Sequence, residues 1–117
     1  MAVILYGISN CDTVKKARTW LDANAVQYTF HDLKKAGASA EMLKAWMAKM
    51  EWDVLMNRKG TTWRGLSDEQ KASVTDTQSA ASLMQEFPSV IKRPILSVDG
   101  KIHVGFSTDN YQQIFRI

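Results

Sequence analysis

The chain has 117 residues, of which 45% are hydrophobic and 23% are charged, and its formal net charge is +3. This length suits one domain of ordinary size, and the composition supports a buried core and argues against a disordered chain. Acidic residues are interleaved with the basic ones and no apolar run is long enough for a membrane span, so we expect neither a nucleic-acid nor a membrane partner.

The N-terminal part of the chain predicts a βαβ unit. Residues 3–7 form a short apolar run that ends in glycine, which is typical of a buried strand. Apolar residues at helical spacing then predict a helix from about 12 to 24, and residues 26–31 alternate as a half-buried strand does. The two strands of such a unit run parallel and are joined by a right-handed crossover.

The middle of the chain is predicted to be helical. A stripe of leucine, tryptophan and methionine predicts a helix over 41–50. Residues 57–67 have the composition of a loop, at whose end Ser67 and Gln70 fit a capping box for a short helix. A further helix is expected over about 77–86, where it ends before a proline.

The C-terminal part contains the strongest hairpin signal, because an Asp-Gly pair separates two predicted strands within residues 93–104. Ser107 is placed to cap a last helix over 108–115. The order β-α-β, helices, β-β-α predicts an α/β, thioredoxin-like (glutaredoxin-like) fold with one four-stranded mixed sheet. We expect a single domain over 1–117, with a helical insertion at about 37–90 between the βαβ and ββα halves.

Cys11 is the only cysteine, so no internal disulfide forms, and a reduced, cytoplasmic compartment is expected. It lies where the first strand ends and the first helix begins, the edge at which open α/β sheets bind ligands. Unpaired N–H groups and the helix dipole stabilise a thiolate there. The alternative is a small packing residue. The polar neighbours favour a reactive thiol: Ser9, Asn10, Asp12 and Thr13.

The residues after Cys11 restrict the chemistry of its thiol. Val14 occupies the fourth position of a Cys-x-x-Cys frame, so an internal dithiol cycle is impossible. Any redox reaction of Cys11 therefore requires an outside thiol to release it. Lys15 and Lys16 add positive charge in the first turn of the predicted helix.

A second candidate feature is the segment that leads into the third predicted strand. Pro94 directly precedes this strand, and a thioredoxin-like fold has a cis-proline at this place, beside the reactive cysteine. Arg93 would then project near the thiol of Cys11. The alternative is a proline at the start of a strand, preceded by a solvated arginine.

A third candidate feature is the segment 57–65, which contains Arg58, two other basic residues and two glycines for tight turns of the backbone. Such a loop can close over an anion, because arginine binds oxyanions and carboxylates in a bidentate way, but a basic loop is equally often solvated. His31 and His103 lack the spacing of metal ligands, so no metal site is expected. The tryptophans are interpreted as packing residues: Trp20, Trp46, Trp52 and Trp63.

Four separated motifs resemble the arsenate reductase-like (ArsC/Spx) family, and most of all its YffB branch: LYGISNCDTVKKAR, NRKGTTWR, IKRPIL and VGFSTDNYQQIF. The resemblance spans essentially the whole chain. It implies a thioredoxin-like fold with a helical insertion, a reactive cysteine at Cys11, and anion-binding arginines at Arg58 and Arg93. Further residues are expected to bind the anion or glutathione: Asn10, Thr13, Lys15 and Pro94.

The chain departs from parts of this family at two positions that bear on function. The arsenate reductases that it resembles carry a third arginine just before the last helix, where this chain has Gly105-Phe106-Ser107. They also carry a histidine four residues before the cysteine, where this chain has Gly7. These departures disfavour arsenate as the physiological substrate. The Spx regulators use a Cys-x-x-Cys switch, which Val14 removes.

The resemblance and the residues together predict a glutathione-dependent monothiol reductase, an oxidoreductase in which Cys11 forms a mixed disulfide. Its co-substrate would be glutathione or another small thiol, its substrate an oxidised thiol or an oxyanion, and it would need no bound cofactor. One alternative is an arsenate reductase. An alternative of another class is an Spx-like adaptor that binds a protein of the transcription machinery.

Overall fold

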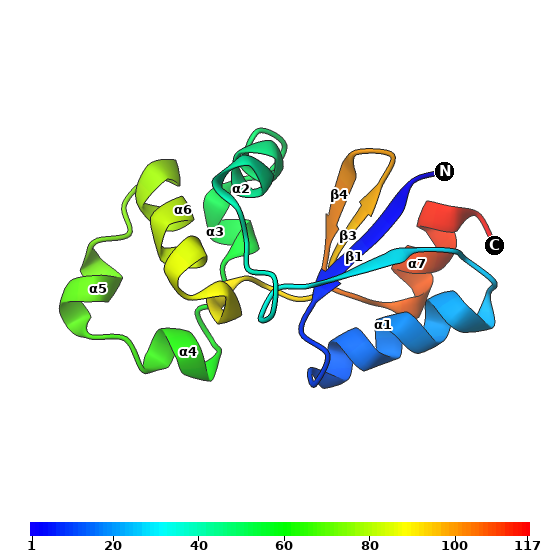
Figure 1. Ribbon diagram of the computed structural model, residues 1–117, viewed down its shortest axis with the longest axis horizontal. Coiled ribbons are helices and arrows are strands. Elements are labelled where there is room, and N and C mark those ends of the chain that lie inside the picture. The colour runs from blue at the N-terminus through cyan, green and yellow to red at the C-terminus, as the bar shows by residue number, and fades with distance from the viewer. The chain divides into compact units, whose positions relative to one another are not determined.

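The two ends of the chain build one unit of the structure and its middle builds another. The computed structural model describes all residues from Met1 to Ile117 (Figure 1). One unit contains Met1–Asp32 and Arg93–Ile117, and the other contains Leu33–Lys92. The insertion expected at about 37–90 lies within the second unit. No helix has both the length and the apolar character that crossing a membrane requires.

The first unit contains a four-stranded sheet. Its strands are β1 (Val3–Gly7), β2 (Thr29–Asp32), β3 (Ile95–Val98) and β4 (Lys101–Val104), in the order β2-β1-β3-β4. Strand β1 pairs in parallel with β2 and antiparallel with β3, which pairs antiparallel with β4. The βαβ and ββα halves therefore share one mixed sheet, and the predicted thioredoxin-like fold is confirmed.

Two helices cover the same face of this sheet, α1 (Asp12–Ala23) and α7 (Thr108–Phe115) (Figure 1). The sheet contributes alternate residues of its two central strands to this face, because Val3 pairs with Val98 and Leu5 with Leu96. All four side chains are buried in one cluster with residues of both helices: Ala17, Leu21 and Tyr111. The cluster holds the start of α1 in a defined position at the end of β1.

Strand β2 begins three residues later than the alternation of 26–31 predicts. Ala25 takes a left-handed conformation with φ 56°, and the N–H of Val26 donates to the carbonyl of Leu21 at 3.0 Å. These residues therefore finish helix α1 instead of starting the strand. The end of α1 itself agrees with the prediction, since Asn24 is its C-cap residue.

The predicted hairpin and the last helix are confirmed. Asp99 and Gly100 both have positive φ values, 51° and 86°, as a two-residue turn between twisted strands requires. The hydroxyl of Ser107 caps α7 by accepting a hydrogen bond from the N–H of Asn110 at 3.1 Å.

The second unit is built from short helices. They are α2 (Ala40–Met47), α3 (Trp52–Leu55), α4 (Thr61–Arg64), α5 (Asp68–Ala72), α6 (Thr77–Glu86) and the 3-10 turn η1 (Pro88–Val90). Helix α6 and the capping box of Ser67 and Gln70 are as predicted. Helix α4 lies inside the expected loop 57–67. This helix buries no side chain, so its sequence has no helical spacing of apolar residues from which it could be predicted.

Candidate active site

Cys11 is the N-cap residue of α1 and directly follows the turn at the end of β1. Its backbone is extended, with φ −85° and ψ 126°, and its N–H donates to the carbonyl of Ile8 at 3.0 Å. Its own carbonyl accepts the N–H of Lys15 at 2.9 Å, so the helix starts at this residue. The thiol is partly exposed. Cys11 therefore lies where the sequence analysis predicted, at the N-terminus of the helix, and its thiol is accessible to solvent.

The surroundings of the thiol lower the pKa of Cys11 below its ordinary value. Partial burial acts against this by raising the pKa, but it is outweighed by the backbone N–H of Val14, the side chain of Arg93, the backbone N–H of Thr13 and the positive charge of Arg93. Cys11 makes no capping hydrogen bond of ordinary geometry. Its large sulfur nevertheless lies close enough to these donors for them to favour the thiolate.

Arg93 and Pro94 lie at the same edge of the sheet as Cys11. The peptide bond between them is cis, as expected for this place in the fold. The carbonyl of Pro94 accepts the N–H of Gly105 at 2.9 Å, which ties this segment to the chain that leads into α7. The guanidinium of Arg93 acts on the Cys11 thiol through a hydrogen bond and through its charge. The structure thus brings these two predicted site residues together.

The other predicted residues near Cys11 have different positions. Asn10 is exposed in the turn before the thiol, and the side chain of Thr13 is exposed as well. Thr13 acts on the thiol through its backbone N–H, not through its hydroxyl. The side chain of Lys15 is exposed one helical turn beyond Cys11. The charge that lowers the pKa of Cys11 comes from Arg93.

Arg58 belongs to the other unit, where two aromatic rings hold it. Its guanidinium carbon lies 5.2 Å from the ring centroid of Trp52 and 5.9 Å from that of Trp63. The preceding Asn57 anchors the segment, since its N–H donates to the carbonyl of Val90 at 2.7 Å and its Oδ1 accepts the N–H of Lys59 at 3.2 Å. These contacts orient the Arg58 side chain before any ligand binds.

The pairing of Arg58 with two tryptophans is a contact that the sequence analysis missed, since it interpreted all tryptophans as packing residues. Trp63 stands five residues after Arg58 in the same basic segment, and that closeness was the one available signal. Trp52, six residues before Arg58 in α3, is almost as close in the sequence.

The close approach of Gly7 to Val14 shapes the end of β1. A Cβ atom on Gly7 would lie 2.7 Å from Cγ2 of Val14, a distance that real Cβ contacts essentially never show. Val14 is itself fully buried in the first turn of α1. The valine at position 14 therefore occupies the space that a side chain at position 7 would need.

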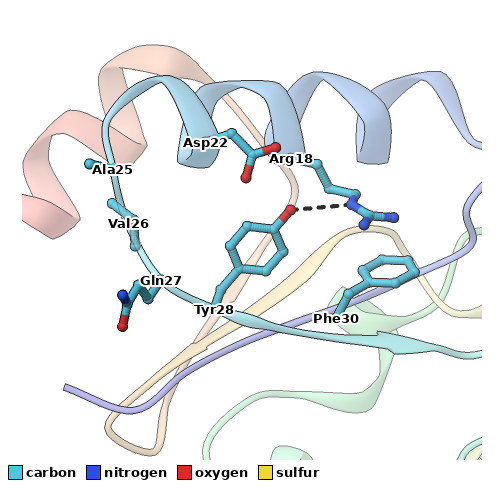
Figure 2. Close-up of a pocket in the computed structure, with 7 residues that line it drawn as sticks. All are labelled: Arg18, Asp22, Ala25, Val26, Gln27, Tyr28 and Phe30. Atoms are coloured by element: carbon cyan, nitrogen blue, oxygen red, sulfur yellow. Dashed lines mark hydrogen bonds between the residues drawn. The ribbon is translucent and has the colours of Figure 1, made fainter.

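A hollow of about 690 Å³ lies further along α1, between its C-terminal half and β2 (Figure 2). Within it, Nε of Arg18 donates to the hydroxyl of Tyr28 at 3.2 Å, and the guanidinium lies 4.1 Å from the centroid of the Phe30 ring. These contacts tie α1 to β2. No cysteine, serine or threonine lines the hollow. Nowhere in the chain do three or more metal-binding side chains gather in a way that could hold a metal ion.

The comparisons with known proteins agree with this site. The sequence profile of the ArsC family matches residues 6–114, so the chain belongs to the ArsC family. This match, together with YffB and Spx relatives, confirms the predicted resemblance to the ArsC/Spx group and to YffB.

Individual relatives cover nearly the whole chain. The solved structure of a YFFB protein is 48% identical and has a TM-score of 0.90, over 96% of this chain and 97% of that chain. An arsenate reductase (ArsC) related protein from Brucella melitensis is 46% identical with a TM-score of 0.77, over 100% and 97%. An uncharacterized protein of Haemophilus influenzae is 42% identical over 97% and 98% of the two chains. The global transcriptional regulator Spx 1 of Bacillus cereus is 21% identical over 95% and 85%.

Proposed function

We propose that this protein is a glutathione-dependent monothiol reductase in which Cys11 is the nucleophile. The observation that carries the proposal is the environment of the Cys11 sulfur. Backbone N–H groups of the first turn of α1 and the guanidinium of Arg93 converge on it and lower its pKa. A packing cysteine needs no such donors, whereas a thiol that attacks sulfur reacts as its thiolate. Membership of the ArsC family supports the broader class of oxidoreductase.

The proposed reaction has two thiol–disulfide exchanges. The Cys11 thiolate attacks the glutathione sulfur of a mixed disulfide, a new disulfide forms on Cys11, and the substrate sulfur leaves as a thiolate that takes up a proton. A second glutathione thiolate then attacks the glutathione sulfur on Cys11, which releases oxidised glutathione and restores the Cys11 thiolate. In sum, one glutathione thiol is consumed, the substrate sulfur leaves as a thiol, and the glutathione half of the mixed disulfide leaves within oxidised glutathione. Because no second cysteine is present, the outside thiol is essential.

The arginines have separate roles in this proposal. Arg93 stabilises the Cys11 thiolate and binds a carboxylate of glutathione. Arg58, oriented by its two tryptophan rings, contributes a second anion contact from the insertion. Further contacts with glutathione are proposed for the residues that surround the thiol: Asn10, Thr13, Lys15 and Pro94. The reaction requires a reducing compartment such as the cytoplasm, where glutathione is kept as the thiol.

Arsenate reduction receives less support, although the Brucella melitensis relative is described as related to arsenate reductase. A third arginine in the segment before α7 would cost either backbone strain or ring packing. Gly105 has φ +85°, a conformation that side chains rarely adopt, and the ring of Phe106 packs edge-on against Tyr111 with centroids 4.7 Å apart. An Spx-like adaptor role is favoured only by the distant Spx relatives, and it does not require a lowered pKa at Cys11.

The proposal is tested by incubating the protein with oxidised glutathione and weighing it by mass spectrometry. We expect one glutathione adduct on Cys11, its removal by reduced glutathione, and none on the Cys11→Ser variant. The same samples are then assayed for reduction of a small glutathione mixed disulfide, coupled to glutathione reductase. Adduct formation and turnover that both depend on Cys11 support the proposal. A protein that forms no adduct and turns over no disulfide contradicts it.

A further inference from the structure

The hollow between α1 and β2 contains an arginine whose hydrogen-bonding capacity is only partly used (Figure 2). Arg18 is half-buried, and its contacts within the hollow are the hydrogen bond from Nε to the hydroxyl of Tyr28 and the stacking on the ring of Phe30. Both Nη groups are left without a hydrogen bond in the chain. A guanidinium with its two Nη groups available is suited to a carboxylate.

The two aromatic residues hold this guanidinium in place before any ligand binds. Phe30 pairs with Leu5 in the sheet, so its ring lies on the face that α1 covers, and Tyr28 stands two residues earlier on the same side. Both rings pack against the buried cluster of the first unit. The Tyr28 hydroxyl accepts the Arg18 hydrogen bond with its oxygen, so its own proton remains available to a second acceptor.

A carboxylate lines the same hollow and does not neutralise the arginine. Asp22 follows Arg18 by four residues in α1, a spacing at which helical side chains often form an ion pair. No ion pair joins them, because the side chain of Arg18 is directed towards the rings of β2 and its approach. Figure 2 shows the hydroxyl of Tyr28 between the two charged groups. The hollow therefore presents a positive and a negative group that are both open to a ligand.

We propose that this hollow binds the head group of an amino acid, in which one small molecule carries a carboxylate and an ammonium. The carboxylate accepts hydrogen bonds from the Nη groups of Arg18 and from the hydroxyl of Tyr28, and the ammonium donates to Asp22. Two kinds of molecule carry this head group: a free amino acid and the γ-glutamyl end of a compound such as glutathione. The inference goes beyond the proposed chemistry of Cys11, which does not line the hollow.

The two opposite charges exclude simpler ligands. A plain carboxylate is attracted by Arg18 but repelled by Asp22, and a plain amine meets the reverse, so only a molecule with both groups gains from the whole site. The volume of about 690 Å³ lies within the range of small-molecule sites. Ala25 and Val26 add apolar lining beside the charged groups, which suits an aliphatic side chain.

The test is a titration with L-leucine, followed by NMR through the backbone amides of residues 25–28 and the Nε–H of Arg18. Isocaproate lacks only the ammonium of leucine, and isoamylamine lacks only its carboxylate. We expect saturable shifts with leucine and binding about tenfold weaker, or worse, for each analogue, because each loses hydrogen bonds between charged groups. S-methylglutathione, titrated in the same way, shows whether the γ-glutamyl head group is also accepted.

Variants of the two charged residues assign the effect to the hollow. Asp22 is exposed, so Asp22→Asn keeps the fold, and it should weaken leucine about tenfold while it strengthens isocaproate by removing a repulsion. Arg18→Lys keeps the charge without the fork and should weaken both. Asp109→Asn makes the same change at an exposed position of α7 outside the hollow, and should leave every affinity as it is.

The opposite responses of leucine and isocaproate to Asp22→Asn are the decisive result, because a general change in stability or net charge would move both ligands in one direction. Leucine that causes no saturable shift, or that binds Asp22→Asn and Asp109→Asn equally well, would overturn the assignment. Equal affinity for leucine and isocaproate in the parent protein would overturn it as well, since the hollow would then bind carboxylates without regard to the ammonium.

Discussion

Val14 fills the space beside Gly7, so that a Cβ atom on Gly7 would lie 2.7 Å from Cγ2 of Val14. These are the two positions at which the resemblance to the family leads us to expect other residues, a histidine at position 7 and a second cysteine at position 14. The contact joins the two departures into one packing arrangement next to Cys11. The contact predicts that a side chain cannot be added at position 7 without a loss of stability unless the side chain at position 14 is made smaller.

Gly7→Ala is therefore expected to destabilise the protein by about 1–3 kcal/mol, the usual cost of overpacking a filled site. Val14→Ala on its own should also destabilise, because it empties a buried position. In the double variant the second change makes room for the first, so the combined loss should be smaller than the sum. Urea denaturation of the four proteins measures this. Strictly additive losses would show that the two side chains do not compete for space.

Arg93→Ala should raise the pKa of Cys11, because it removes both a hydrogen bond and a positive charge from the thiolate. Arg93→Lys should keep the pKa lowered but weaken glutathione binding, since lysine lacks the bidentate fork of arginine. The pH dependence of alkylation and the KM for glutathione report the two effects separately. Lys92→Ala, at the exposed neighbouring position, is the control. A pKa unchanged in Arg93→Ala would remove Arg93 from the site.

Arg58 and the tryptophan rings beside it make a third test. Arg58→Ala should raise the KM for glutathione, and Trp63→Ala should do so to a lesser degree by releasing the guanidinium, a contact worth about 0.5–1 kcal/mol or a few-fold in affinity. Trp63→Phe keeps an aromatic face and should restore most of the loss. If Trp63→Phe is as impaired as Trp63→Ala, the ring does not act by holding Arg58.

Tyr111→Phe should stabilise the protein by about 1 kcal/mol. The hydroxyl of Tyr111 is buried without a hydrogen-bond partner, and burial raises its pKa well above the ordinary range. Removing it relieves the cost of an unsatisfied polar group while the ring contacts with Trp20 and Phe106 remain. Thermal and urea denaturation measure the change. A loss of stability would mean that the hydroxyl is satisfied, for example by a buried water.

Much of the fold was predictable because local signals coincide with the tertiary structure. Residues 3–7 are an apolar run that is in fact a central strand, and the Asp-Gly pair directs a two-residue hairpin. The start of β2 was predicted too early, because Ala25 adopts a left-handed conformation that is unusual for alanine and could not be predicted from the sequence. Helix α4 was missed, because its ends are set by Gly60 and Gly65 and it has no buried face.

The candidate site also has a part that the sequence predicted and a part that it did not. The position of Cys11 was accessible from local features, a strand end and a helix start, whereas the cis bond at Pro94 was expected only from the predicted fold. The contact of Gly7 with Val14 and the stacking of Arg58 on Trp52 depend on atomic packing. No spacing rule reports such packing, so these contacts became visible only in three dimensions.

The lowered pKa of Cys11 also predicts how stability depends on pH. A thiol whose pKa is lower in the folded chain than in the unfolded chain stabilises the fold as it ionises. This contribution is fully present above the unfolded value of about 8.5 and is lost as the pH falls through the folded-state pKa. Stability relative to Cys11→Ser should therefore increase with pH across that window. A difference that stays constant with pH would argue against a perturbed thiol.

The most direct measurement is the titration of Cys11 itself, by thiolate absorbance and by the rate of alkylation as a function of pH. With a single cysteine, both signals report one sulfur, and Cys11→Ser supplies the baseline. We predict a pKa clearly below the value of about 8.5 for a free cysteine, with an alkylation rate that levels off above it. A pKa at or above about 8.5 would contradict the account, because Cys11 would then be an ordinary thiol.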